Sequence, residues 1–250
     1  MKRKEIFAGN WKMFKTCSEA VNLAQELISG IKIKEGREYV VFPPFTALKV
    51  VADTCKGSAL RVGAQNMYYE KEGAFTGEIS PVMIKDCGAA FVLLGHSERR
   101  HIFHETDALI NKKIKAALTY GLQPMVCVGE LLEERESGKT NIVLESQVKG
   151  AFEGLRTEDM KNISIAYEPV WAIGTGKVAT PEIAEEAHVT IRKYISELFG
   201  ENVANAFPIL YGGSVKPDNI EGLYSMENID GVLVGGASLD GASFLKIINV

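Results

Sequence analysis

The sequence predicts an α/β fold, a single-domain (β/α)8 barrel spanning residues 1–250. Three observations predict it. Eight short β-like runs alternate with longer helix-like runs, several of the short runs are apolar throughout, and no evident linker or low-complexity stretch interrupts them. Eight units favour a closed barrel, but periodicity alone does not separate it from a doubly wound open sheet. With 46% hydrophobic residues, the chain has enough apolar material for one large core.

The strands are expected where short runs are rich in apolar and β-branched residues. Continuous runs such as Phe91–Leu94 and Val232–Val234 are typical of parallel strands buried on both faces. In chain order, the expected strands are Glu5–Asn10, Glu38–Phe42, Leu60–Gln65, Ala89–Leu94, Gln123–Val128, Ile163–Glu168, Pro208–Tyr211 and Gly231–Val234.

Capping signals mark helices in the segments between the strands. Thr16 to Glu19 has the pattern of a capping box, and Gly30 closes the apolar periodicity that follows. Thr180-Pro181 offers an N-cap and an N1 proline, with a helical apolar repeat running on to Gly200. Strands alternating with such helices form right-handed βαβ units.

Charge and cysteine content exclude several classes of protein. The net charge is −4 with no basic stripe, so we expect no nucleic-acid partner and no membrane association. No apolar stretch has the length of a signal peptide core or a membrane span. The four cysteines, which are Cys17, Cys55, Cys87 and Cys127, are far apart and form no C-x-x-C pair, so a reducing cytoplasm is expected. No metal-binding or nucleophile-elbow motif is present, and no metal site is predicted.

Polar and glycine residues cluster just after the expected strands, where barrels and open α/β sheets both place their sites. Glu168 follows a buried strand, which suits a general base of tuned pKa or, alternatively, a carboxylate that caps a helix or pairs with a lysine. His96 lies at a strand-to-helix junction, where N–H dipoles disfavour imidazolium; an ordinary loop histidine is the alternative. Lys12 can supply positive charge for an anion or is simply solvated.

Two glycine pairs predict a phosphate site. Gly212-Gly213, followed by Ser214, and Gly235-Gly236 come directly after the seventh and eighth strands, where barrels often hold phosphate on backbone N–H groups. Two tight turns are the alternative. Residues 174–179 match G-x-G-x-x-A, but they do not directly follow a strand, so a dinucleotide site is not predicted.

The segment from Pro169 to Ala179 has the composition of a lid. Glycine and proline punctuate it, and Trp171 offers a large apolar anchor. The predicted lid residues are Pro169, Trp171, Gly174, Thr175, Gly176 and Ala179.

Several blocks in order resemble the triosephosphate isomerase family. They extend from residue 9 to residue 239 and are Gly9–Met13, Gly73–Glu78, Leu94–Arg100, Cys127–Glu130, Ala166–Ala179, Tyr211–Val215 and Gly231–Leu239. The resemblance implies a barrel enzyme that needs no cofactor or metal and interconverts dihydroxyacetone phosphate and D-glyceraldehyde 3-phosphate in glycolysis and gluconeogenesis.

The resemblance also implies a role for each site residue. Glu168 would be the base, His96 the electrophile, Lys12 an electrostatic clamp and Asn10 a substrate-orienting group, with Glu98 in a supporting role. The substrate and its phosphate would contact Asn10, Lys12, Gly174, Ser214, Gly235 and Gly236.

The family resemblance further implies a homodimer, in which the loop around Phe75 and Thr76 reaches into the partner subunit. Two other functions stay open on the residues alone. One is another sugar-phosphate barrel enzyme, such as a Schiff-base aldolase, and the other is a non-catalytic phosphate-binding scaffold.

Overall fold

A closed barrel of eight parallel strands forms the centre of the molecule, as predicted. The computed structural model describes residues 3–173 and 179–250. Each strand pairs with the next in sequence, and β8 closes the barrel on β1. The strands are β1 (Glu5–Asn10), β2 (Arg37–Phe42), β3 (Leu60–Ala64), β4 (Phe91–Leu94), β5 (Gln123–Val128), β6 (Ser164–Tyr167), β7 (Ile209–Tyr211) and β8 (Gly231–Val234).

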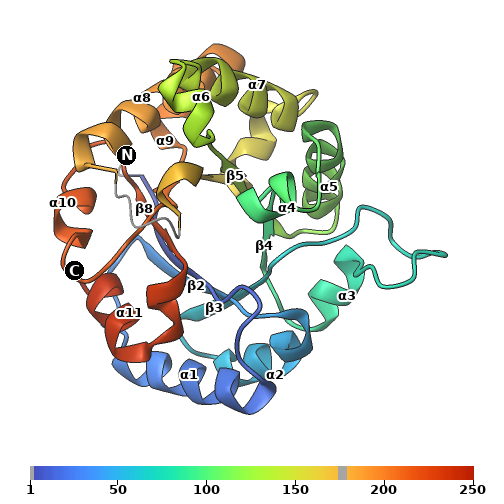
Figure 1. The fold of residues 1–250 in the computed structure, drawn as a ribbon. Coiled ribbons are helices and arrows are strands. Elements are labelled where there is room, and N and C mark those ends of the chain that lie inside the picture. Colours follow the sequence, from blue (N-terminus) through green and yellow to red (C-terminus); the bar gives the residue numbers. More distant parts are fainter. Residues whose placement is uncertain (1–2, 174–178) are drawn as a thin grey trace.

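Helices surround the barrel as an outer layer (Figure 1). The α-helices are α1 (Cys17–Gly30), α2 (Phe45–Cys55), α3 (Pro81–Asp86), α4 (Ser97–His101), α5 (Asp107–Thr119), α6 (Leu132–Glu136), α7 (Thr140–Phe152), α8 (Pro181–Phe199), α9 (Glu201–Ala206), α10 (Ile220–Tyr224) and α11 (Gly241–Ile248). Three short 3₁₀ segments are η1 (Thr157–Asn162), η2 (Val170–Ala172) and η3 (Gly236–Leu239). None of the helices within the described residues is long and apolar enough to cross a membrane.

The predicted caps are present. The Glu19 carboxylate accepts a hydrogen bond from the Thr16 backbone N–H at 2.8 Å, and α1 ends at Gly30. The Thr180 hydroxyl accepts from the backbone of Ile183 at the start of α8. Gly200 ends α8 with a φ of 91°, a left-handed conformation that favours glycine.

The strand sequences alternate between two cores. Side chains such as Ile6 and Ala8 fill the interior of the barrel, whereas Phe7 packs outward against the helices. Both faces of every strand are therefore buried, which explains the nearly continuous apolar runs. Three strands have the predicted bounds, and the other five differ by one or two residues at one or both ends; Glu168, for example, follows β6 rather than ending it.

One segment departs from the barrel. The chain between β3 and α3 projects outward beyond α3 (Figure 1). Tyr68 stacks on Tyr69 and on Phe75, with ring centres 4.3 and 4.6 Å apart, so this arm carries its own aromatic cluster. Phe75 and Thr76 therefore lie on the arm, and neither lines the cavity described below.

Candidate active site

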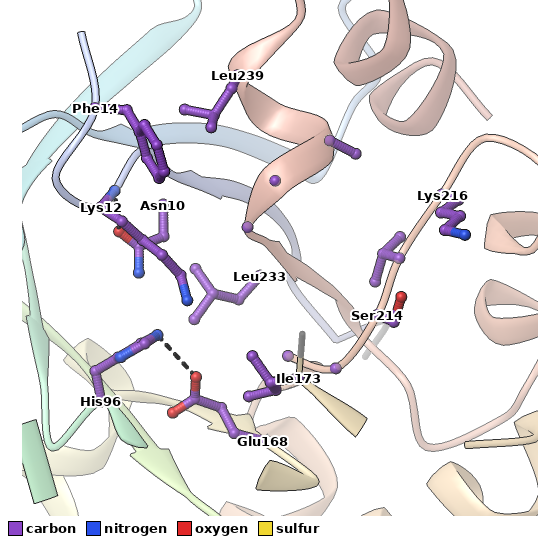
Figure 2. Close-up of a pocket in the computed structure, with 16 residues that line it drawn as sticks. Asn10, Lys12, Phe14, His96, Glu168, Ile173, Ser214, Lys216, Leu233 and Leu239 are labelled. Carbon is purple, nitrogen blue, oxygen red and sulfur yellow. Dashed lines mark hydrogen bonds and ion pairs between the residues drawn. The ribbon is translucent and has the colours of Figure 1, made fainter. Parts of the chain in front are cut away.

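A cavity of about 450 Å³ opens at the carboxyl-terminal end of the barrel and gathers most of the predicted site (Figure 2). The predicted residues that line it are Asn10, Lys12, His96, Glu168, Ser214, Gly235 and Gly236. They come from the ends of β1, β4, β6, β7 and β8, so the closed barrel brings together residues that are far apart in sequence. The predicted residue Gly174 lies outside the described residues, as do Thr175 and Gly176.

Glu168 and His96 form the centre of the site. The Nε2 atom of His96 lies 2.9 Å from Oε1 of Glu168, and both side chains are buried (Figure 2). The backbone N–H of Ser97 donates to the other carboxylate oxygen of Glu168 at 2.9 Å. Burial raises the pKa of Glu168, but His96, Ser97 and the Cys127 thiol together outweigh it and hold this pKa below its ordinary value.

The tautomer of His96 follows from its other ring nitrogen. His96 is the N-cap of α4, and its Nδ1 accepts a hydrogen bond from the backbone N–H of Glu98 at 3.3 Å. A nitrogen that accepts from an N–H carries no proton, so a neutral ring has its proton on Nε2, which faces Glu168 and the cavity. His96 is thus arranged to donate a proton or hydrogen bond from Nε2.

Lys12 is held in an uncommon backbone conformation beside this pair. Its φ is 49°, in a region that non-glycine residues seldom adopt. Asn10 Oδ1 accepts from the Lys12 N–H at 3.0 Å, and Gln65 Nε2 donates to the Lys12 carbonyl at 2.7 Å. The ammonium lies 2.6 Å from the Glu98 carboxylate, so Glu98 contacts both Lys12 and the Nδ1 side of His96. Glu98 therefore supports the site without lining the cavity.

The glycine loops lie on the other side of the cavity. Ser214 is across from His96 and Glu168, and Leu233 and Ile173 contribute apolar walls (Figure 2). The side-chain amide of Asn219 donates to the Ser214 carbonyl, and its oxygen accepts from the Lys216 N–H, which fixes this loop. One cavity is therefore lined both by the glycine loops and by the carboxylate–imidazole pair.

Three of the predicted lid residues lie within the described part of the chain, near the two ends of the segment 169–179. They are Pro169, Trp171 and Ala179. Pro169 contacts the glycine loop, since a Cβ on Gly213 would lie 2.9 Å from its Cγ. Trp171 and Ala179 are buried, and Trp171 donates from Nε1 to Glu130 at 2.8 Å instead of facing the cavity.

Other residues of the site were not predicted. Gln65, Ile173 and Leu233 were missed, and Ser97 and Cys127 were given no role beside Glu168. Gln65 carries a signal that was available, because it is a polar residue at the carboxyl end of the predicted strand Leu60–Gln65. Within the described chain, no group of three or more His, Cys, Asp or Glu side chains is arranged to hold a metal ion.

The parallel barrel and its buried acid–base pair define an α/β-barrel enzyme with a site at the carboxyl ends of its strands. A model of the triosephosphate isomerase family matches residues 5–250. The chain belongs to the triosephosphate isomerase family.

Curated relatives agree over nearly the whole chain. The triosephosphate isomerase of Carboxydothermus hydrogenoformans is 55% identical over 247 residues, covering 99% of this chain and 98% of the relative. That of Caldanaerobacter subterraneus subsp. tengcongensis is 54% identical, with 99% of each chain covered. That of Citrifermentans bemidjiense is 53% identical, with 99% and 98% covered.

Proposed function

We propose that this chain interconverts dihydroxyacetone phosphate and D-glyceraldehyde 3-phosphate, a step of glycolysis and gluconeogenesis. The observation that carries the proposal is the contact between Glu168 and His96 at one end of a cavity whose other end is lined by glycine loops. The carboxylate and the imidazole suit proton transfer, and the loops suit a phosphate. Family membership favours this function over a Schiff-base aldolase or a phosphate-binding scaffold.

Glu168 is the proposed base. Its carboxylate removes the proton from the carbon next to the carbonyl, and the electron pair of that C–H bond forms a C=C bond while the carbonyl oxygen takes negative charge. Glu168 returns the proton to the neighbouring carbon of the resulting enediol or enediolate. A proton also moves between the two oxygens, so that the former carbonyl oxygen becomes a hydroxyl and the former hydroxyl oxygen becomes the new carbonyl. Because Glu168 contacts His96 and the Ser97 N–H, the substrate must replace these contacts before the transfer.

His96 and Lys12 are the proposed partners of the substrate oxygens. The Nε2 proton of His96, which faces Glu168 and the cavity, is proposed to donate to the oxygen on which negative charge develops, and the ammonium of Lys12 to add positive charge there. Asn10 is proposed to orient the substrate. This role is supported by its position at the end of β1 and by the hydrogen bond that its Oδ1 accepts from the Lys12 N–H. Glu98 fixes both groups, because it contacts each of them.

The phosphate is proposed to bind the backbone N–H groups of Ser214, Gly235 and Gly236, with Gly174 from the segment after β6. The segment from Pro169 to Ala179 is proposed as the lid. Its support is that Ile173 lines the cavity and that Pro169 packs on the glycine loop. Covering the site would exclude water and suppress loss of phosphate from the intermediate.

We also propose a homodimer that acts in the cytoplasm. All four cysteines are free, which suits a reducing compartment. Large apolar side chains are exposed on the loop after β1, on the arm after β3 and after α4, in neighbouring parts of the barrel. These side chains are Met13, Phe14, Phe75, Ile102 and Phe103, and a second subunit would cover them.

The test is a coupled isomerase assay of the purified protein in a chelating buffer. We expect turnover of either triose phosphate without added metal. Borohydride added with the substrate should leave no substrate–lysine adduct, since no Schiff base forms. A trapped adduct would favour the aldolase type, and binding of the triose phosphate without turnover would favour the scaffold.

A further inference from the structure

The backbone around Glu168 lies directly on the segment that ends β5. The Glu168 N–H donates to the Val128 carbonyl at 2.7 Å, and the Val170 N–H donates to the Glu130 carbonyl at 3.1 Å. A Cβ on Gly129 would lie 1.7 Å from the Glu168 carbonyl oxygen, so only glycine permits this close approach. Residues 128–130 therefore hold the backbone of the proposed base through hydrogen bonds and close packing.

The side chain of Glu130 holds the residues on both sides of the base. Its carboxylate is fully buried and accepts from the Tyr167 hydroxyl at 3.0 and 3.1 Å. It also accepts from Trp171 Nε1 at 2.8 Å. Tyr167 directly precedes Glu168, and Trp171 follows three residues after it. One buried carboxylate thus fixes a short stretch of chain that has Glu168 within it.

A buried carboxylate needs an opposite charge, and Arg135 on α6 supplies it. Its Nη1 lies 3.4 Å from Oε1 of Glu130. Its guanidinium lies 4.9 Å from the centre of the Trp171 ring, within the range of a cation–π interaction. Arg135 therefore contacts both the carboxylate and one of the two side chains that this carboxylate holds.

We propose that Arg135 is a positioning residue for Glu168, acting through Glu130. This inference rests on the proposed function. Arg135 does not line the cavity, so it acts on the base only through the groups it contacts. Without the positive charge of Arg135, the buried Glu130 carboxylate is less stable in its present position. Tyr167 and Trp171 then lose a fixed hydrogen-bond acceptor. A misplacement of about 1 Å at a reacting group can cost about 10²-fold in rate, so small shifts at residues 167–171 are sufficient.

The first test is Arg135→Gln, which removes the charge and leaves a shorter polar side chain. We expect kcat per folded molecule to fall by about tenfold or more, while KM stays within about twofold because the substrate-binding loops are unchanged. Arg135→Lys should restore part of kcat, since it returns the charge but not the planar guanidinium over Trp171. Arg156→Gln is the matched control, because Arg156 is an exposed arginine that pairs with Asp159 away from the cavity.

The second test asks whether Arg135 acts through Glu130. The double variant Glu130→Gln with Arg135→Gln should lose no more kcat than Glu130→Gln alone. The inference is overturned if Arg135→Gln keeps kcat within twofold of the wild type or if the two single losses multiply in the double variant. Loss of folding in both Arg135→Gln and Arg135→Lys, followed by circular dichroism, would also overturn it by assigning Arg135 to stability alone. A wild-type protein without isomerase activity would instead reject the proposed function.

Discussion

At the scale of single residues, the proposed chemistry depends on the contacts that hold Glu168. Burial raises its pKa, but the contacts with His96 and Ser97 lower it below the ordinary value. The carboxylate is therefore ionised and ready at neutral pH. A substrate that replaced those contacts would leave the effect of burial, so the pKa of Glu168 would rise and the carboxylate would become a stronger base.

Lys12→Met tests the positive charge of the site. The thioether side chain has similar length but cannot stabilise an oxyanion, so kcat/KM should fall by about 10²-fold or more, as for loss of one oxyanion donor. Steady-state kinetics with either triose phosphate measures this. Lys56→Met, at an exposed lysine before β3 on the opposite end of the barrel, should behave as the wild type. A Lys12→Met protein with unchanged kcat/KM would remove Lys12 from the reaction.

At the scale of elements, the loop after β7 depends on a residue without a side chain. A Cβ on Gly213 would lie 2.2 Å from the Tyr211 hydroxyl and 2.9 Å from Pro169 Cγ. The loop, the end of β7 and the segment after β6 therefore pack together at one point, and an added methyl group must push them apart.

Gly213→Ala should accordingly weaken substrate binding. We expect KM to rise by about tenfold, since the displaced loop also carries the Ser214 N–H proposed for the phosphate. Gly222→Ala, in α10, is a suitable control, because its Cβ would have only an ordinary contact of 3.5 Å with Pro181 of α8. Equal KM values in the two variants would show that the loop does not bind the phosphate.

At the scale of the whole molecule, His188 makes stability depend on pH. It is fully buried, its Nδ1 donates to the Asn228 carbonyl, and its Nε2 has no hydrogen-bond partner within the described residues. Burial lowers the pKa of His188 from 6.5 to about 3. Between these values the unfolded chain binds a proton at this residue and the native protein does not, so stability is lost as pH falls from 6.5 towards 3.

The expected slope is about 1.4 kcal/mol per pH unit from this one group. His188→Gln should remove it, so the free energy of unfolding should fall less steeply between pH 6 and 4 than in the wild type. His104→Gln, at an exposed histidine, should keep the wild-type slope. Urea unfolding at constant protein concentration measures the three slopes, and an identical slope in His188→Gln would contradict the account.

The proposed dimer is a second property of the whole molecule. Phe75→Glu places a charge on the arm, where Phe75 is 40% exposed, and should give a monomer in analytical ultracentrifugation. Val189→Glu, at a valine of α8 that is 49% exposed, should leave the dimer intact. A wild-type protein that sediments as a monomer would reject the dimer.

Much of the fold could be predicted because the barrel repeats one strand–helix unit eight times. Apolar runs such as Phe91–Leu94, caps such as Thr180 and polar residues after strands are local signals that the structure confirms. Contacts across the chain have no local signal. The Lys12–Glu98 pair joins residues 86 positions apart, and nothing near Trp171 predicts that its indole binds Glu130.

Glu168 can be the base only if its carboxylate reaches the substrate carbon, and the kinetics of Glu168→Asp measure this requirement. This change keeps the charge and retracts the carboxylate by one methylene. We predict that kcat falls by about 10²–10⁴-fold while KM changes little, because the base no longer reaches the substrate carbon. Turnover at the wild-type rate in Glu168→Asp would contradict the assignment.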